Sequence, residues 1–364
     1  MNKFVFSSPR KYVQGAGVIA ELGHYLAELG TKAFLIADDT VWTLTSQAVT
    51  ASLKQASIDL TYQRFNGEAS SNEITRLATL AKAAKSTVIV GLGGGKTLDS
   101  AKAVADECQV AVAIVPTIAS TDAPCSALSV IYSDEGVFES YRFYTSNPDL
   151  VLVDTAICAK APVRLFASGI ADGLATFVEA QAVKNSHSAS MVNGLPTVAA
   201  MAIAQACEET LLTYGFSACQ AVARQVVTPA VEAVVEANTL LSGLGFENAG
   251  LAAAHAIHNG FTALKGDIHH LTHGEKVAYG TLTQMVLEQR PDDEIADYIH
   301  FYRSINMPTT LKELHLEGVS REDLIKVGEL ANSEGDTLKN LNPNLSGEDI
   351  ANAIIAVDSL SQSL

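Results

Sequence analysis

The chain has 364 residues, of which 24 are Lys or Arg and 40 are Asp or Glu, so its formal net charge is −16. This length suggests two domains or one large domain. Its composition, 48 % hydrophobic and 18 % charged, excludes a disordered chain. The negative charge argues against nucleic acid or an anionic membrane as a partner, because both require a positively charged protein surface.

The first residues and the cysteines indicate the compartment. No long apolar run follows the charges of residues 1–11, so no signal peptide is expected, and no stretch approaches the ~20 apolar residues of a membrane span. The five cysteines are odd in number and widely spaced, which is typical of reduced thiols. We therefore expect a cytoplasmic protein. The cysteines are Cys108, Cys125, Cys158, Cys207 and Cys219.

The first 160 or so residues alternate short apolar runs with helix-like stretches. The runs predict strands at 33–37, 59–65, 87–91, 111–115 and 150–153. The stretches between them predict helices at 41–56, 72–85 and 100–106. Continuous apolar strands separated by helices predict a parallel sheet that is covered on both faces.

The character of the chain changes near residues 161–162, after which it is rich in alanine and has few β-branched runs. Prolines stand where helices would start or break. The sequence thus predicts an α/β, Rossmann-like domain over 1–161 and an all-α domain over 162–364. The helices of the second domain are expected at 169–183, 198–213, 221–240, 248–263 and 275–288.

Three glycines, Gly93, Gly94 and Gly95, follow the predicted strand at 87–91 and lead into a helix. Backbone N–H groups at such a helix start can bind a pyrophosphate. The G-x-G-x-x-G template would need glycine at Lys96, and the P-loop template would need glycine at Val90. A tight turn also requires small residues, but the adjacent lysine favours a phosphate site.

Asp38 follows the first predicted strand, where α/β folds place a nucleotide ribose. Its carboxylate would accept hydrogen bonds from the ribose hydroxyls and repel a 2′-phosphate. An Asp here can equally be the N-cap of the next helix, and Asp39 competes for either role.

Five of the nine histidines lie between His255 and His273. His255 and His258 share one helix face, and His273 stands at the start of another helix. Imidazoles combined with a carboxylate suit zinc or ferrous iron. Asp172, in an otherwise apolar helix start, is either a cap or a ligand. A single histidine here would be a solvated or hydrogen-bonded side chain, whereas the cluster favours a metal.

With these motifs the chain resembles, over essentially its whole length, the glycerol dehydrogenases of the iron-containing alcohol dehydrogenase superfamily. The resemblance implies a dehydroquinate synthase-like architecture with NAD between the domains. Residues matching the phosphate and ribose contacts are Asp38, Gly94, Gly95, Lys96, Thr97 and Asp99, and those matching the nicotinamide half are Thr117, Ser120, Ser126, Leu128 and Tyr132. The matching segments are 93–99, 116–126, 169–172, 254–260 and 273–278.

The resemblance also assigns the metal ligands, Asp172, His255 and His273, and places Asp122 near the substrate. The implied chemistry is oxidation of glycerol to dihydroxyacetone, in which the metal lowers the pKa of the reacting hydroxyl and NAD takes the hydride. The proton acceptor is either Asp122 or His258. Asp122 could also be only a turn residue.

Iron-using relatives carry a further histidine four residues after the ligand aspartate, where this chain has Thr176. Three protein ligands with an open position are typical of catalytic zinc. We therefore expect one Zn²⁺ per chain, although His258 or His270 could supply a fourth ligand.

Other readings of this fold are a dehydroquinate synthase-type lyase, a glycerol-1-phosphate dehydrogenase and a related diol dehydrogenase. The first two bind a substrate phosphate and so call for Lys or Arg in the site. Residues 243–264 contain neither, which favours an uncharged polyol. If the protein were a nucleotide sensor without catalytic activity, one or more of the metal ligands would be expected to be missing, whereas Asp172, His255 and His273 are all present. We expect a homo-oligomer and assign no function to the tail beyond about residue 317.

Overall fold

The computed structural model describes residues 3–364, so Met1 and Asn2, which begin the segment where no signal peptide is expected, lie outside the described residues. The chain forms two compact units. We call residues 7–162 with 221–243 the α/β unit, and residues 3–6, 163–220 and 244–364 the helical unit. The chain passes between the units four times: after residue 6, after residue 162, and within the helices α7 (Val198–Val222) and α9 (Ser242–Ala249).

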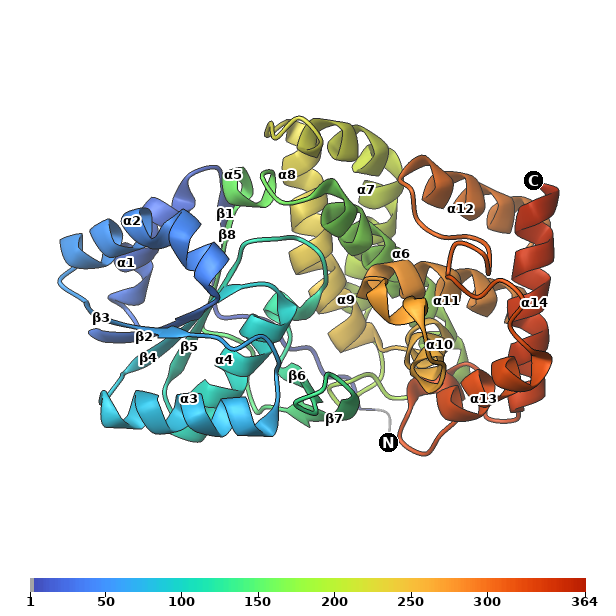
Figure 1. Ribbon diagram of the computed structural model, residues 1–364, viewed down its shortest axis with the longest axis horizontal. Coiled ribbons are helices and arrows are strands. Elements are labelled where there is room, and N and C mark those ends of the chain that lie inside the picture. Colours follow the sequence, from blue (N-terminus) through green and yellow to red (C-terminus); the bar gives the residue numbers. More distant parts are fainter. Residues whose placement is uncertain (1–2) are drawn as a thin grey trace. The chain divides into compact units, whose positions relative to one another are not determined.

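The α/β unit is built on a six-stranded sheet in which every pair of neighbouring strands is parallel (Figure 1). The strand order is β1-β8-β5-β4-β2-β3. The central strands are buried because their Val, Ile and Leu side chains are covered on both faces. The parallel sheet is therefore confirmed. Its strands are β1 (Tyr12–Gly15), β2 (Lys32–Ala37), β3 (Asp59–Arg64), β4 (Val88–Gly93), β5 (Ala111–Pro116) and β8 (Leu150–Asp154).

Helices cover both faces of this sheet. Figure 1 shows α1 (Leu22–Leu26) and α2 (Asp39–Gln55) on one face, with α3 (Ser71–Ala83) and α4 (Gly95–Cys108) on the other. From β2 the chain moves outward to β3 and then returns to β4 on the other side of β2. Because strand crossovers are right-handed, this reversal puts the helices on opposite faces. It also creates a switch point between the carboxyl ends of β2 and β4.

Three strands were not anticipated by the sequence pattern. They are the edge strand β1 and the hairpin strands β6 (Leu128–Tyr132) and β7 (Phe138–Phe143). β7 mixes exposed and half-buried residues, so it lacks the apolar run that marks the central strands. The remaining elements of this unit are η1 (Val18–Glu21), η2 (Ala123–Cys125), α5 (Thr155–Cys158), α8 (Pro229–Glu236) and the π-helical turn η3 (Ala237–Leu241).

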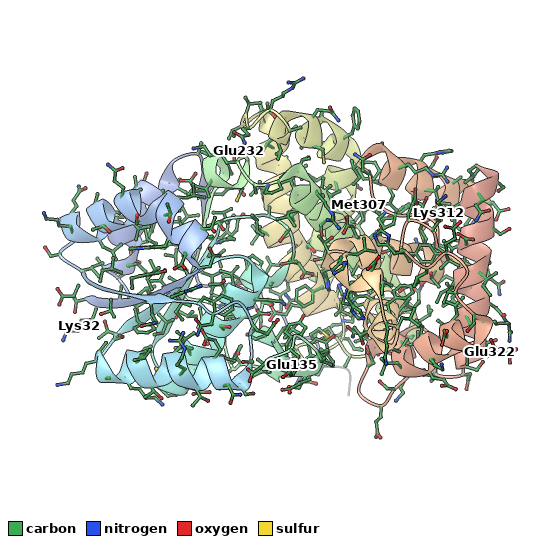
Figure 2. The ribbon with its side chains drawn as sticks, viewed as in Figure 1. Lys32, Glu135, Glu232, Met307, Lys312 and Glu322 are labelled. Carbon is green, nitrogen blue, oxygen red and sulfur yellow. The ribbon has the colours of Figure 1, made fainter. Side chains whose placement is uncertain are left out.

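The expected continuous helix at 221–240 is wrong. α7 ends at Val222, and a new helix, α8, begins at Pro229, whose missing N–H suits the first helical position. Thr228 caps α8 by accepting from the backbone N–H of Val231. Glu232, labelled in Figure 2, joins α8 to the sheet: it accepts from Gln14 Nε2 at 2.8 Å and from Thr155 Oγ1 at 2.7 Å.

Every element from residue 163 onward is helical, so the expected helical character of the second part of the chain is confirmed, although residues 221–243 belong to the α/β unit. Within the helical unit α10 packs against α11 and α13, and α6 packs against α11. None of the helices in residues 3–364 is both long and apolar enough to span a membrane. Besides α7 and α9, the unit contains α6 (Val163–Ser186), α10 (Ala253–Gly260), η4 (Phe261–Ala263), η5 (Asp267–His270), α11 (His273–Leu287), α12 (Asp292–Ser304), α13 (Arg321–Ala331), η6 (Thr337–Asn340) and α14 (Gly347–Ser363).

Candidate functional site

Three helices of the helical unit bring Asp172, His255 and His273 together. Each offers one ligand atom, and these atoms lie within 4.8 Å of one another. Asp172 Oδ1 is 3.4 Å from His255 Nε2 and 3.1 Å from His273 Nε2. The side chain of Asp172 is 0 % exposed and that of His273 is 32 % exposed, so solvent reaches the group from the His273 side. The expected metal-ligand set is confirmed as a group.

The charges of the site favour a bound cation. Burial raises the pKa of Asp172, but the two imidazoles more than offset this and hold it well below its usual range. Burial lowers the pKa of His255, yet the Glu179 and Asp172 carboxylates raise it well above its usual value. Positive charge is therefore stabilised at this point of the protein. One carboxylate and two imidazoles form a donor set that fits zinc or ferrous iron.

The two residues considered as a fourth ligand do not join the group within residues 3–364. The ring of His258 is centred 4.2 Å from that of His273, while the exposed His270 faces Asp267, with 3.6 Å between Nδ1 and Oδ1. Thr176 is buried one turn after Asp172. Its methyl group would collide with a Cβ placed on residue 245, which is glycine.

A polar chain that the sequence analysis missed runs behind His258. His258 Nδ1 lies 3.1 Å from Asn259 Oδ1, and Asn259 Nδ2 donates to Asp336 Oδ2 at 3.1 Å. Burial lowers the pKa of His258 well below its usual value, and His273 lowers it further. Asp336 lies in the tail to which no function was assigned, so no local motif could have indicated this contact.

In the α/β unit, Asp38 and the glycine loop lie at the switch point between β2 and β4. These strands are neighbours, with Ile36 paired to Gly91, so the residues that follow them share one edge of the sheet. Asp38 accepts from the backbone N–H of Val41 at 2.8 Å and is the N-cap of α2. Gly94 is the N-cap of α4 and has no side chain to occupy the N–H groups there. The ribose and phosphate contacts stay predictions.

Lys96, expected near the phosphates, has partners within the α/β unit. Its Nζ is 2.7 Å from Glu68 Oε2 and 5.2 Å from the ring centre of Tyr132. Thr97 is buried beside Gly93, where a Cβ would be 2.9 Å from Thr97 Oγ1. The glycine therefore allows close contact between the end of β4 and the first turn of α4.

A buried lysine that the sequence analysis did not single out holds the loop after β5. Lys102 Nζ is 3.2 Å from Asp99 Oδ1 and donates to the backbone oxygens of Ala123 at 2.6 Å and Leu128 at 2.9 Å. Asp99 accepts from the backbone N–H of Val130 at 3.0 Å through its other oxygen. Asp99 thus has a structural role, and its expected contact with the cofactor stays a prediction.

The residues expected along the nicotinamide half surround the same loop. Thr117, Ser120, Ser126 and Leu128 are buried, and Tyr132 is half-buried. Asp122 is half-buried at the start of η2, with Ser242 Oγ at 3.4 Å from its Oδ2. The structure thus gathers these residues in one unit, and their contacts with a ligand stay predictions.

Comparisons with known proteins agree with this geometry. Residues 9–155 match the family model of iron-containing alcohol dehydrogenases. A glycerol dehydrogenase of Escherichia coli is 48 % identical over 98 % of this chain and 97 % of its own, and a glycolaldehyde reductase of Halobacterium salinarum is 46 % identical over 98 % of both chains.

A solved structure gives the same result. The crystal structure of glycerol dehydrogenase from Schizosaccharomyces pombe superposes with a TM-score of 0.96 at 44 % identity, covering 100 % of this chain and 92 % of the other. Likeness of this extent includes both units and all three ligand positions. The chain therefore belongs to the iron-containing alcohol dehydrogenase family, in its glycerol dehydrogenase group.

Proposed function

We propose that the protein oxidises glycerol to dihydroxyacetone with NAD⁺. The C2–H bond breaks and its hydride passes to the nicotinamide, while the C2 hydroxyl loses its proton, which gives NADH and H⁺. The observation that carries this proposal is the buried group of Asp172, His255 and His273 in a chain that is nearly half identical to glycerol dehydrogenases. Carboxylate and imidazole donors are suited to a Lewis-acidic ion that polarises an alcohol.

The ion is proposed to be zinc, one per chain. Three protein ligands support this choice, together with a buried threonine, Thr176, one turn after Asp172. When bound, such an ion lowers the pKa of a substrate hydroxyl. Elemental analysis of protein expressed without metal supplementation tests the identity. About one zinc per chain is expected, and iron at that level with zinc absent would contradict it.

NAD is proposed to bind at the switch point of the α/β unit. Asp38 and the start of α4 at Gly95 support the ribose and phosphate contacts, since helix N-termini and strand ends at such a point bind nucleotides in this class of fold. Asp122 and His258 are the candidate proton acceptors. Asp122 is supported by its partial exposure, and His258 by its ring contact with the ligand His273.

A second candidate activity is the reduction of glycolaldehyde, because a relative of that name is 46 % identical over nearly the whole chain. Glycolaldehyde and dihydroxyacetone share a carbonyl next to a hydroxyl-bearing carbon. One site for two neighbouring oxygens would serve both substrates. The preference of the enzyme for one of them then depends on whether the site has room for the third carbon, which dihydroxyacetone has and glycolaldehyde lacks.

The deciding experiment follows NADH absorbance with several substrates side by side. Glycerol, 1,2-propanediol and ethane-1,2-diol test oxidation, while dihydroxyacetone and glycolaldehyde test reduction. Glycerol 1-phosphate must also be tested, because a lysine near the site would suit a substrate phosphate. Lys276 on α11 lies outside the lysine-free stretch 243–264 and is near enough to lower the pKa of His258. We expect glycerol to be oxidised and the phosphate ester to be inert. Turnover of the ester alone would overturn the proposal.

The subunits are further proposed to form a homo-oligomer. Support comes from exposed apolar side chains of the helical unit, Val198 at 90 % and Phe4 at 60 % exposure. Light scattering coupled to size-exclusion chromatography measures the mass in solution. A monomer at micromolar concentration would contradict this part of the proposal.

A further inference from the structure

The N-terminus of α10, the helix that carries His255, is capped by side chains from two other helices. Glu179 Oε1, from α6, accepts from the amides of Ala252 and His255 at 2.9 and 3.0 Å. Gln284 Oε1, from α11, accepts from the two amides between them at 2.9 and 3.0 Å. All four amides at this helix start thus have acceptors, although the N-cap residue, alanine, has no polar side chain.

Only one of these two capping side chains also touches a metal ligand. Glu179 Oε2 lies 2.6 Å from His255 Nδ1, so the carboxylate bonds the backbone with one oxygen and the imidazole with the other. A carboxylate can only accept, so Nδ1 must carry the hydrogen. In the neutral ring this leaves a lone pair on Nε2, the nitrogen that faces Asp172.

The burial and charge of Glu179 support the same role. Its side chain is 0 % exposed, and it lies on α6 seven residues, or about two turns, after Asp172. A second buried carboxylate beside the first is unfavourable unless positive charge accompanies the pair. Two carboxylates with two neutral imidazoles balance the charge of one divalent cation.

We propose that Glu179 is a positioning residue for the metal centre, which selects the metal-binding tautomer of His255 and fixes its ring. The proposal rests on the ligand group Asp172, His255 and His273 and does not depend on which alcohol the protein oxidises. Carboxylates behind ligand histidines typically contribute 10–100-fold to metal affinity. The alternative is that Glu179 only caps α10, as Gln284 does.

Two variants separate these roles. Glu179→Gln keeps an oxygen for the two backbone amides but turns an N–H toward His255 Nδ1, which forces the hydrogen onto Nε2 and blocks ligation. Gln284→Met removes the other pair of caps and leaves the carboxylate–imidazole contact in place. If Glu179 positions the ligand, the first variant loses metal affinity and the second loses only stability.

The measurement is Zn²⁺ affinity of the full-length apoprotein, by competition with a chromophoric chelator, alongside thermal unfolding without metal. We expect Glu179→Gln to bind Zn²⁺ about 10–100-fold more weakly, and Gln284→Met to bind it within about twofold of the wild type at a lower melting temperature.

Wild-type affinity in Glu179→Gln, or an equal loss in both variants, would overturn the proposal. If Glu179→Gln does not fold, Glu179→Asp answers the same question, because it keeps the charge but is one methylene too short to hold both groups. Weakened binding in a folded Glu179→Asp supports the role, and unchanged binding refutes it. Because no alcohol is present, a failure of the proposed glycerol oxidation would leave this result intact.

Discussion

Each unit contains a buried cluster of charges, and the two clusters are balanced in different ways. In the α/β unit, Lys102 is 2 % exposed and meets Asp99 and backbone carbonyl oxygens, so the chain supplies both the cation and its acceptors. In the helical unit, Asp172 and Glu179 are fully buried beside the imidazoles of His255 and His273, and Glu179 also accepts from two backbone amides. The first cluster is complete without a ligand, whereas the second is balanced by a cation from outside the chain.

This difference separates a structural cluster from a binding site more clearly than burial does. Both clusters are buried, and both contain a carboxylate with several polar partners. Breaking a self-balanced pair exposes the remaining charge to a low-dielectric interior and destabilises the fold. Removing a charge from a cluster that binds an external ion weakens binding of that ion first.

The largest effect is expected from Asp172→Asn. The amide keeps the shape of the side chain but removes the charge nearest the ion, and a metal typically supplies several kcal/mol of charge stabilisation to the reaction. Turnover should fall by about 10³-fold or more, since each 1.36 kcal/mol is a factor of ten. Steady-state NADH production and metal content measure this. After the metal is removed with a chelator, added zinc should restore the turnover of the wild type but not that of Asp172→Asn. A variant with full metal and normal turnover would contradict the comparison.

Lys102→Met should act on stability instead. It leaves Asp99 buried without its cation, which is expected to cost about 3–5 kcal/mol of unfolding free energy. Urea unfolding measures the loss, and zinc affinity should stay unchanged. The double variant Lys102→Met with Asp99→Asn removes both charges and should be more stable than Lys102→Met alone. If the single and the double variant are equally unstable, the unpaired charge of Asp99 is not the cause of the lost stability.

Asp122→Asn tests whether Asp122 takes part in proton transfer. This residue lies in the loop that Lys102 holds by donating to the Ala123 oxygen. If Asp122 accepts or relays the proton, turnover should fall about 10²-fold, a usual loss for general acid–base groups. NADH binding, measured by fluorescence, should stay within about twofold. Ser242→Ala, which removes the neighbouring hydroxyl, is the control for a change in local packing. Normal turnover in Asp122→Asn would leave Asp122 a turn residue.

The smallest effect is expected at Asp38, which has both a structural and a proposed binding role: it caps α2, and it is proposed to accept hydrogen bonds from the ribose. Asp38→Gly loses only a few tenths of a kcal/mol as a cap. It should raise the ratio of NADP to NAD efficiency about tenfold, since a carboxylate no longer repels a 2′-phosphate. Asp39→Gly, which loses an exposed ion pair with Arg64, is the matched control. Equal use of both cofactors by the wild type would refute the assignment.

Sequence reasoning predicted the central strands well because each is a buried apolar run. It failed at β1 and β7, where partly exposed residues hide the pattern, and it also missed the short, mostly buried β6. It also merged the end of α7 with α8, because apolar residues continue through Val226 and Val227 although the helix is interrupted over residues 223–228. Helix boundaries there depend on a proline and a threonine cap rather than on hydrophobic spacing.

For the site, the ligand residues were predictable, but the side chains that support them were not. Asp172, His255 and His273 stand in recognisable segments, whereas Glu179 is one polar residue within a long apolar helix. Its partners on α10 lie 73 and 76 positions away in the sequence. Asp336 reaches Asn259 across 77 positions. Such pairings are created by helix packing, which leaves no local trace in sequence.

The stack of Trp42 on Tyr62 places the tryptophan fluorescence of the protein in one unit only. The rings are 4.3 Å apart and tilted by 7°, and Trp42 is the only tryptophan in the chain. Both rings belong to the α/β unit, so indole emission reports the melting of that unit alone, while helicity measured by circular dichroism is dominated by the other. Recording the two signals together would reveal whether the units unfold in one transition or two, without any attached label.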